Sequence, residues 1–172
     1  MVLPFDPIRE ARRQWGLHGW DASDEMAAVT SLIRATQIAM ARIDEALRPL
    51  DLTFSRYEAL VLLHFSRDGA LPLGKVGERL MVHPASVTNT IDRLEAEGFV
   101  ERVPHPTDRR SALARITPAG SKVMDAATGV LVAVDFGLTG LDGDAIAALE
   151  AILAPFRRDA GDYEAEADRA SV

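Results

Sequence analysis

Four arginines gather in a short stretch near the middle of the chain, where their guanidinium groups could bind phosphate. The only acid between residues 102 and 117 is Asp108, so this segment is basic although the 172-residue chain carries a net charge of −7. A planar guanidinium pairs with phosphate oxygens and loses its hydration more readily than an ammonium group does. The segment is therefore a candidate anion-binding surface. Its arginines are Arg102, Arg109, Arg110 and Arg115.

The helix predicted just before this segment, over residues 84–98, has a small polar outer face. On a helical wheel Val87, Ile91 and Leu94 fall together and must be buried. Short hydroxyls and amides on the opposite side could reach base edges in a DNA major groove, from which bulky side chains would hold the helix away. The pattern also fits an ordinary amphipathic helix with a solvated face. The candidate DNA-contacting residues are Ser86, Thr88, Asn89 and Arg93.

No pattern typical of catalysis or metal binding accompanies these residues. The chain has no cysteine, and the spacing of its four histidines does not match a metal site. A Gly-rich phosphate loop and a strand–nucleophile–helix turn are also missing from the sequence. We therefore expect no enzyme activity, no cofactor and no metal. Among the histidines, His64 falls on an apolar stripe and is predicted to be a hydrogen-bonded core residue.

Hydrophobic periodicity predicts a mainly helical chain. Helices are expected over 7–15, 23–48, 55–67, 75–80, 84–98, 118–138 and from 142 to about 159. Asp6, Ser23, Thr117 and Asp142 are the predicted N-caps, and Ser55 is predicted to form a capping box with Glu58. No apolar run is long enough for a membrane span, and the N-terminus has no apolar signal region, so we expect a cytoplasmic protein.

A short extended segment at 71–73 and two longer strands complete the predicted architecture. Residues 99–103 and 112–117 read as strands, and the polar loop between them has the length of a hairpin connection. Because the hairpin follows two helices joined by a short turn at 81–83, the order of elements is that of a winged helix-turn-helix. The expected fold class is mainly α with a small β-wing (α+β).

The loop also resembles a signature of the MarR family of transcriptional regulators. That signature is Asp-x-Arg, five residues, then Leu-Thr; here Asp108-Arg109-Arg110 is followed after five residues by Ile116-Thr117. The surrounding stretch LEAEGFVERVPHPTDRRSALARIT is similar to the family as well, and the likeness runs from about Asp24 to Phe156. One departure is His105, which stands where the family often has an acid.

The resemblance implies a homodimer that binds double-stranded DNA at a pseudo-palindromic operator. The helix over 84–98 would enter the major groove, and Arg110 would reach the minor groove with Asp108 orienting its guanidinium. Arg109 and Arg102 would contact phosphates. We expect residues 1–54 to form an N-terminal extension and dimerisation helices, 55–117 the DNA-binding lobe, 118–160 further dimerisation helices and 161–172 a frayed tail.

The long N-terminal extension resembles a urate-responsive branch of the same family, in which a tryptophan and an acid contribute to the effector site. Thr90 stands where that branch is expected to have an arginine, which argues against urate itself. A small aromatic or phenolic effector is the expectation, although packing in the core or dimer is the alternative for each aromatic residue. The candidate ligand-binding residues are Trp15, Trp20, Tyr57, Glu58 and His64.

Together these features predict a homodimeric repressor that a small ligand releases from DNA. Activation instead of repression stays open. A winged-helix module that binds protein, and an architectural DNA-binding protein without an effector, are the alternatives. The operator, the regulated genes and the effector do not follow from the sequence.

Overall fold

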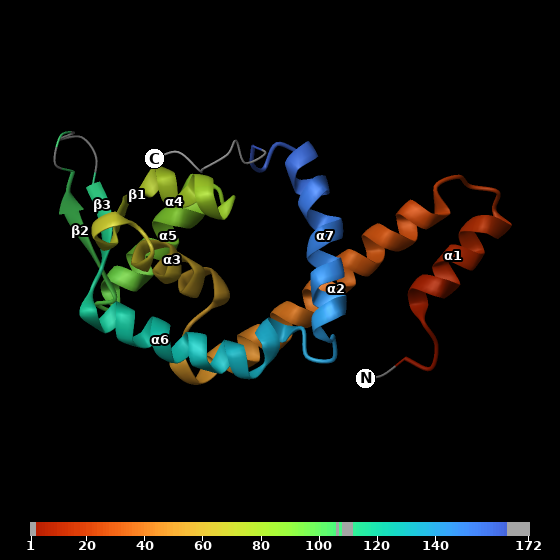
Figure 1. Ribbon diagram of the computed structural model, residues 1–172, viewed down its shortest axis with the longest axis horizontal. Coiled ribbons are helices and arrows are strands. Elements are labelled where there is room, and N and C mark those ends of the chain that lie inside the picture. Colours follow the sequence, from red (N-terminus) through yellow and green to blue (C-terminus); the bar gives the residue numbers. More distant parts are fainter. Residues whose placement is uncertain (1–2, 106, 108–111, 165–172) are drawn as a thin grey trace. The chain divides into compact units, whose positions relative to one another are not determined.

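The computed structural model describes residues 3–105, 107 and 112–164. The chain divides into two compact units, Met1–Gly137 and Leu138–Val172. The first unit is predominantly helical and contains a small antiparallel sheet (Figure 1). This confirms the predicted fold class, a helical chain with a β-wing.

The first unit begins with two helices, α1 and α2, whose N-terminal ends are capped in different ways. In α1 (Pro7–Leu17) Asp6 accepts hydrogen bonds from Ile8 N and Arg9 N, which confirms the predicted N-cap. The prediction for α2 (Ser23–Leu47) was wrong, because its N-cap is Ala22, with φ 59°, and no side chain caps it. The helix starts instead from a left-handed turn of the backbone.

Helix α3 (Phe54–His64) follows a short 3-10 turn, η1 (Arg48–Leu50), and starts earlier than the sequence suggested. Thr53 is its N-cap and accepts a hydrogen bond from Arg56 N, so the predicted capping box of Ser55 and Glu58 is wrong. Two hydroxyl residues compete for this end of the helix, and the upstream one is used. Tyr57 is buried, as an apolar stripe requires.

The predicted core histidine is also wrong. His64, the last residue of α3, is exposed, and its ring packs against Phe65 with centroids 5.5 Å apart. Because α3 ends at this residue, its apolar stripe stops at the edge of the core and the His64 side chain lies on the surface.

The helix-turn-helix consists of α4 (Leu73–Leu80) and α5 (Pro84–Ala96), after the 3-10 turn η2 (Arg67–Gly69). Met81, with φ 51°, ends α4 and turns the chain toward α5. The helices approach closely at Gly77, where a Cβ would lie 3.1 Å from Val87 Cγ2 and 3.3 Å from Val82 O. A side chain there would require Val87 or the turn at Val82 to shift by a few tenths of an ångström.

The wing is a three-stranded sheet in the order β1-β3-β2. The predicted hairpin forms from β2 (Val100–Pro104) and β3 (Ala112–Ile116), with Val100 opposite Ile116. The short strand β1 (Ala70–Pro72) adds to the other edge of β3, with Leu71 opposite Ala114. The sheet thereby ties the wing to the segment between α3 and α4.

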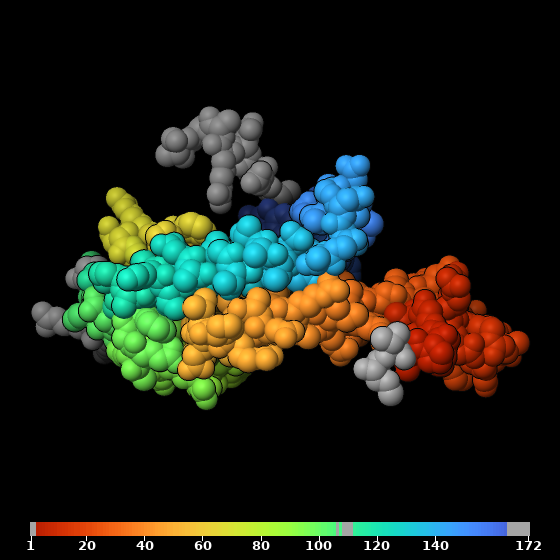
Figure 2. Space-filling model, turned by 90° about the horizontal axis from the view of Figure 1, so that it is seen from below, coloured from red at the N-terminus to blue at the C-terminus, as the bar shows by residue number. Residues whose placement is uncertain are grey.

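Helix α6 (Pro118–Ala133) starts at Thr117, the predicted N-cap, but ends before the predicted boundary at 138. The chain then forms a 3-10 turn, η3 (Asp135–Gly137), in which Asp135 and Phe136 both have φ 49°. Three successive left-handed residues, including Gly137, cannot continue an α-helix. Helix α6 lies beside α2, as the cyan and orange surfaces show (Figure 2).

One hydrophobic core joins these elements. Its largest fully buried side chains come from α2, α3, α4, α5, β2 and α6: Leu47, Leu60, Leu63, Val76, Ile91, Leu94, Val100 and Leu131. In α2 only Ile43 and Leu47 are buried, so most of this 25-residue helix contributes nothing to the core of a single chain.

The second unit contains α7 (Gly143–Asp159). Asp142 accepts a hydrogen bond from Ala145 N, which confirms the predicted N-cap, and Pro155 lies inside the helix. Ile152 and Phe156 are about two-thirds exposed, and α7 has no buried residue. Among the described residues, no helix combines the length and apolarity needed to cross a bilayer.

A close contact between α6 and the start of β2 predicts a sharp difference between two glycines of one helix. A Cβ on Gly120 would lie 2.1 Å from Phe99 O, whereas one on Gly129 would meet nothing within 4 Å. Gly120→Ala should lower the free energy of unfolding by about 1–3 kcal/mol. Gly129→Ala should leave it unchanged or raise it by up to ~1 kcal/mol. Urea denaturation measures both, and equal effects would contradict this packing.

Candidate nucleic-acid interface

The start of α5 is held by its own turn and by the core. His83 is the N-cap, and its Nδ1 accepts a hydrogen bond from Ala85 N at 3.2 Å. Pro84 occupies the first helical position, where its missing N–H costs nothing. On the inner face Val87 is 3% exposed, and Ile91 and Leu94 are fully buried. The rotation of α5 about its axis is therefore determined by the core.

The opposite face of α5 carries the predicted contact residues. Ser86, Thr88, Asn89 and Arg93 are all exposed. Thr88 Oγ1 donates to Pro84 O at 3.1 Å, and Arg93 Nε donates to Asn89 Oδ1 at 3.2 Å. All four residues are thus exposed on α5: Asn89 and Arg93 lie together opposite the buried stripe, and Ser86 and Thr88 lie on its two flanks.

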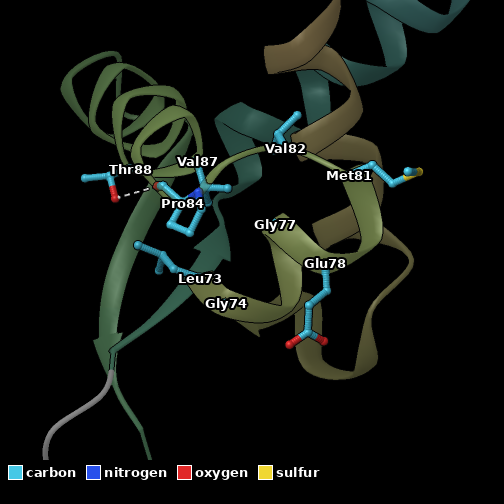
Figure 3. Close-up of a pocket in the computed structure, with 9 residues that line it drawn as sticks. All are labelled: Leu73, Gly74, Gly77, Glu78, Met81, Val82, Pro84, Val87 and Thr88. Carbon is cyan, nitrogen blue, oxygen red and sulfur yellow. Dashed lines mark hydrogen bonds between the residues drawn. The ribbon is translucent and has the colours of Figure 1, made fainter. Parts of the chain in front are cut away.

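An apolar cleft of about 550 Å³ lies between α4 and α5 (Figure 3). Gly74 and Gly77 border it on the side of α4, and Pro84 and Thr88 border it on the side of α5. Its one charged lining residue, Glu78, is paired with Lys75 at 2.7 Å. The cleft is the space left by the close helix-turn-helix packing, and its chemistry does not single out a ligand.

Arg102 on β2 reaches back to α5. Its guanidinium pairs with Asp92 and Glu95, and its backbone N donates to Glu95 Oε1 at 3.2 Å. The hydrogen bond to Asp92 raises the pKa of Arg102 above its ordinary value. This residue therefore ties the wing to α5, and two acids offset the charge that was expected to meet phosphate.

The remaining wing residues divide between described and undescribed positions. Arg115 lies 3.7 Å from Glu101 on the neighbouring strand, and Thr107 N donates to His105 Nδ1 at 3.3 Å. The predicted contact residues Asp108, Arg109 and Arg110 lie outside the described residues.

The other end of α5 is attached to α3 by a second arginine. Arg56, which is 8% exposed, pairs with Glu97 and also donates to Asp51 O. Gly98, with φ 74°, then ends the helix as the sequence predicts. The ion pair holds the C-terminal end of α5 while the turn at His83 holds the other end. Sequence reasoning did not identify Arg56, since nothing in its spacing distinguishes it from a surface arginine.

The candidate ligand-binding residues separate into two groups. Tyr57, Glu58 and His64 line one pocket of about 640 Å³ between α3 and α6. Trp15 and Trp20 do not line it; they pack edge to face at 4.9 Å, and Trp15 Nε1 donates to Asp21 O at 2.8 Å. The tryptophans fasten the turn between α1 and α2.

Several residues of this pocket were not predicted. Phe136 reaches it only because α6 ends early and the chain turns at η3, which a helical pattern running to residue 138 conceals. Phe54 is the first residue of α3 and Phe65 follows its last residue, while Asp125 and Thr128 come from α6. Thr128 Oγ1 lies 3.1 Å from the Tyr57 hydroxyl.

Comparison with known proteins agrees with this architecture. A family model described as "MarR family" matches residues 52–112. The crystal structure of Sco5413, a MarR family transcriptional regulator from Streptomyces coelicolor, is 50% identical with a TM-score of 0.77 and covers 83% of this chain and 99% of that chain. The chain belongs to the MarR family.

Other MarR proteins are more distant. A mutant of Escherichia coli MarR in complex with operator DNA is 26% identical, with a TM-score of 0.69, over 79% of this chain and 98% of that chain. The multiple antibiotic resistance protein MarR of Salmonella typhimurium is 29% identical over 83 residues, which is 48% of this chain. The match spans only 56% of that relative's length. The family is one of transcriptional regulators, not enzymes.

In this MarR chain Glu58 provides a test of the pocket's electrostatics. Burial raises the pKa of Glu58 above its ordinary value of 4.5. The folded state therefore disfavours the ionised carboxyl, and this penalty is present at neutral pH and disappears as the pH falls through the raised pKa toward 4.5. Glu58→Gln should be more stable than the wild type near neutral pH, and the difference should shrink in acid.

Urea denaturation of both proteins across this pH range measures the effect. Glu45→Gln, at an exposed position of α2, is the matched control and should show no such trend. An advantage of Glu58→Gln that grows as the pH falls would contradict the burial of this carboxyl.

Proposed function

We propose that this protein is a homodimeric, DNA-binding transcriptional regulator whose α5 helix enters the major groove. The supporting observation is that Ser86, Thr88 and Asn89 of α5 are exposed while its apolar stripe is buried. A MarR relative has been crystallised with operator DNA, which favours the same partner for this chain. Such a regulator acts in the cytoplasm, where the DNA is.

The proposed contacts fall into base-reading and positioning groups. Asn89 and the two hydroxyl residues read base edges, while Arg93 exchanges its hydrogen bond with Asn89 for a phosphate. At the wing tip Arg110 enters the minor groove, where the negative potential is strong, with Asp108 as its orienting acid and Arg109 on the backbone. We assign Arg102 to positioning the wing, because Asp92 and Glu95 hold it.

A second copy would cover the apolar surface that one chain leaves open. Along α2, Val29 and Ile33 are more than half exposed, and Leu32 and Ile38 are more than two-fifths exposed. Burying such a stripe against a twofold-related copy removes apolar area from water and gives closed symmetry. In a symmetric dimer the two α5 helices would meet DNA about 34 Å apart, one helical turn.

Regulation completes the proposal: the protein represses transcription and leaves its operator when a small molecule binds the pocket of Tyr57, Glu58 and His64. The pocket is open and large enough for such a molecule. A ligand can shift the equilibrium only if it binds the DNA-incompetent arrangement more tightly. The proposal therefore requires that the ligand move α5 or change the spacing between the two copies.

Operator binding tests the proposal. Arg110→Ala should weaken binding to the DNA that flanks the protein's own gene by about 1–3 kcal/mol. Raising the salt concentration should weaken binding, because neutralised phosphates release counterions. Fluorescence anisotropy with labelled duplexes measures both effects. The control is Arg13→Ala, since Arg13 is paired with Glu10 on α1.

Asn89→Ala adds a test of specificity, because it should reduce the preference for the operator over random DNA. Unchanged affinity in Arg110→Ala would remove the wing from the interface. Equal binding of the wild type to operator and random duplexes would favour an architectural protein, and no binding to either would favour a module for protein recognition.

A further inference from the structure

Four aromatic rings gather around the pocket between α3 and α6. The rings of Phe54 and Tyr57 are stacked with centroids 6.0 Å apart, and Phe136 lies 6.4 Å from Tyr57. Phe65 is part of the same lining and is 80% exposed. Ring faces that surround an open space attract a cation through their quadrupole.

The position of Phe136 is built into the fold. Its backbone is left-handed, with φ 49°, which is costly for an aromatic residue and must be held by its neighbours. Next to it a Cβ on Gly137 would lie 2.5 Å from Ala39 O, and Gly137 O accepts a hydrogen bond from Arg42 Nη1 at 2.8 Å. These contacts with α2 fix the turn η3, which places the Phe136 ring near Tyr57.

The charges of the pocket are acidic. Its lining, all within the described part of the chain, includes Glu58, Asp125 and His64 but no lysine or arginine. Glu58 is half-buried, and no ion pair or hydrogen bond joins its carboxylate to the described residues. By contrast, Glu97 and Glu95 at the interface are each paired with an arginine. The pocket thus keeps a partly desolvated negative charge without a counter-ion.

We propose that this pocket binds an organic ammonium ion, a small aromatic or apolar amine, with its ammonium group on the Glu58 carboxylate and its apolar body against the rings of Phe54, Tyr57 and Phe136. The proposal rests on the proposed function, in which this pocket holds the effector, and it changes the expected effector from a phenol to a cation. An aromatic acid would place its own carboxylate beside two others, which is unfavourable.

Two residues of the pocket, Glu58 and Leu80, connect it to α5. Glu58 and Leu80 also line a small cavity of about 80 Å³, whose other side is formed by Ser86, Val87 and Thr90 of α5. An ammonium group drawn to Glu58 therefore binds one side chain away from the N-terminal half of α5. Movement of Glu58 or Leu80 changes the packing that orients the DNA-contacting face.

Three probes of nearly equal shape and different charge test the proposal: 2-naphthylmethylamine, 2-naphthylmethanol and 2-naphthoic acid. Near pH 8 a primary amine is protonated and carboxylates are ionised. Calorimetric titration of the full chain should give at least about tenfold tighter binding for the amine than for the alcohol, as one charge-assisted hydrogen bond supplies. The acid should bind weakest.

Variants separate this site from binding elsewhere. Glu58→Gln should weaken the amine about tenfold and leave the alcohol nearly unchanged. Phe136→Leu should weaken the amine and the alcohol by similar factors, because both probes place the same apolar body against this ring. Glu45→Gln, at an exposed position of α2, should change neither. Equal affinity for the amine and the alcohol, or no effect of Glu58→Gln, would overturn the proposal.

Failure of the proposed function would look different. Operator binding without any probe tests the regulator alone and does not depend on the pocket. If the amine binds through Glu58 and also lowers operator affinity, both the ligand class and the regulation are supported. If it binds through Glu58 while operator affinity stays the same, the cation site stands and the ligand-controlled repression is overturned. If no probe binds, the cation site is overturned and DNA binding is unaffected.

Discussion

The burial of a single stripe of α5 is the constraint on which the other features of this molecule depend. Val87, Ile91 and Leu94 are almost completely removed from solvent, and each residue along a helix turns its side chain by about 100°. A rotation that exposed this stripe would bury hydroxyls and amides without partners, at a cost of about 1–3 kcal/mol for each group. Because the apolar face of α5 is buried in the core, its polar face points outward.

The charge distribution complements this geometry. Two arginines that contact α5 are already paired within the chain: Arg102 with Asp92 and Glu95, and Arg56 with Glu97. The overall charge of −7 means that the chain as a whole does not attract DNA without regard to sequence. In the proposed complex, tight binding therefore depends on base contacts, on the wing tip and on two copies acting together. In the proposed ligand pocket, by contrast, neither Glu58 nor Asp125 is paired with an arginine among the described residues.

Local signals in the sequence were sufficient wherever one residue type determines the backbone. Asp6, Thr117 and Asp142 cap helices as expected, and Gly98 ends α5 with a positive φ. The apolar stripe of α5 and the two wing strands also followed from their periodicity. These features need no knowledge of distant contacts, because capping and alternation act within a few residues.

The predictions that failed concern features of the backbone that contacts between distant parts of the chain determine. Thr53 and Ser55 are both suitable caps, and choosing between them depends on how α3 packs. The left-handed turn at Phe136 is maintained by the contact between Gly137 and α2, 98 residues away at Ala39, so the helical pattern up to residue 138 gave no warning. Trp15 and Trp20, which the family resemblance placed among the candidate ligand residues, pack against each other at the turn between α1 and α2 and do not line the pocket of Tyr57; their ligand role stays a prediction. The family resemblance identified the lobe but could not place these contacts.

The central claim is that two copies of the chain present paired α5 helices to one duplex. Native mass spectrometry of the complex with operator DNA, combined with hydroxyl-radical footprinting, tests it most directly. The account predicts two chains on each duplex and two protected patches whose centres lie about one helical turn apart, roughly 10 base pairs. A single chain on each duplex with one protected patch would contradict it.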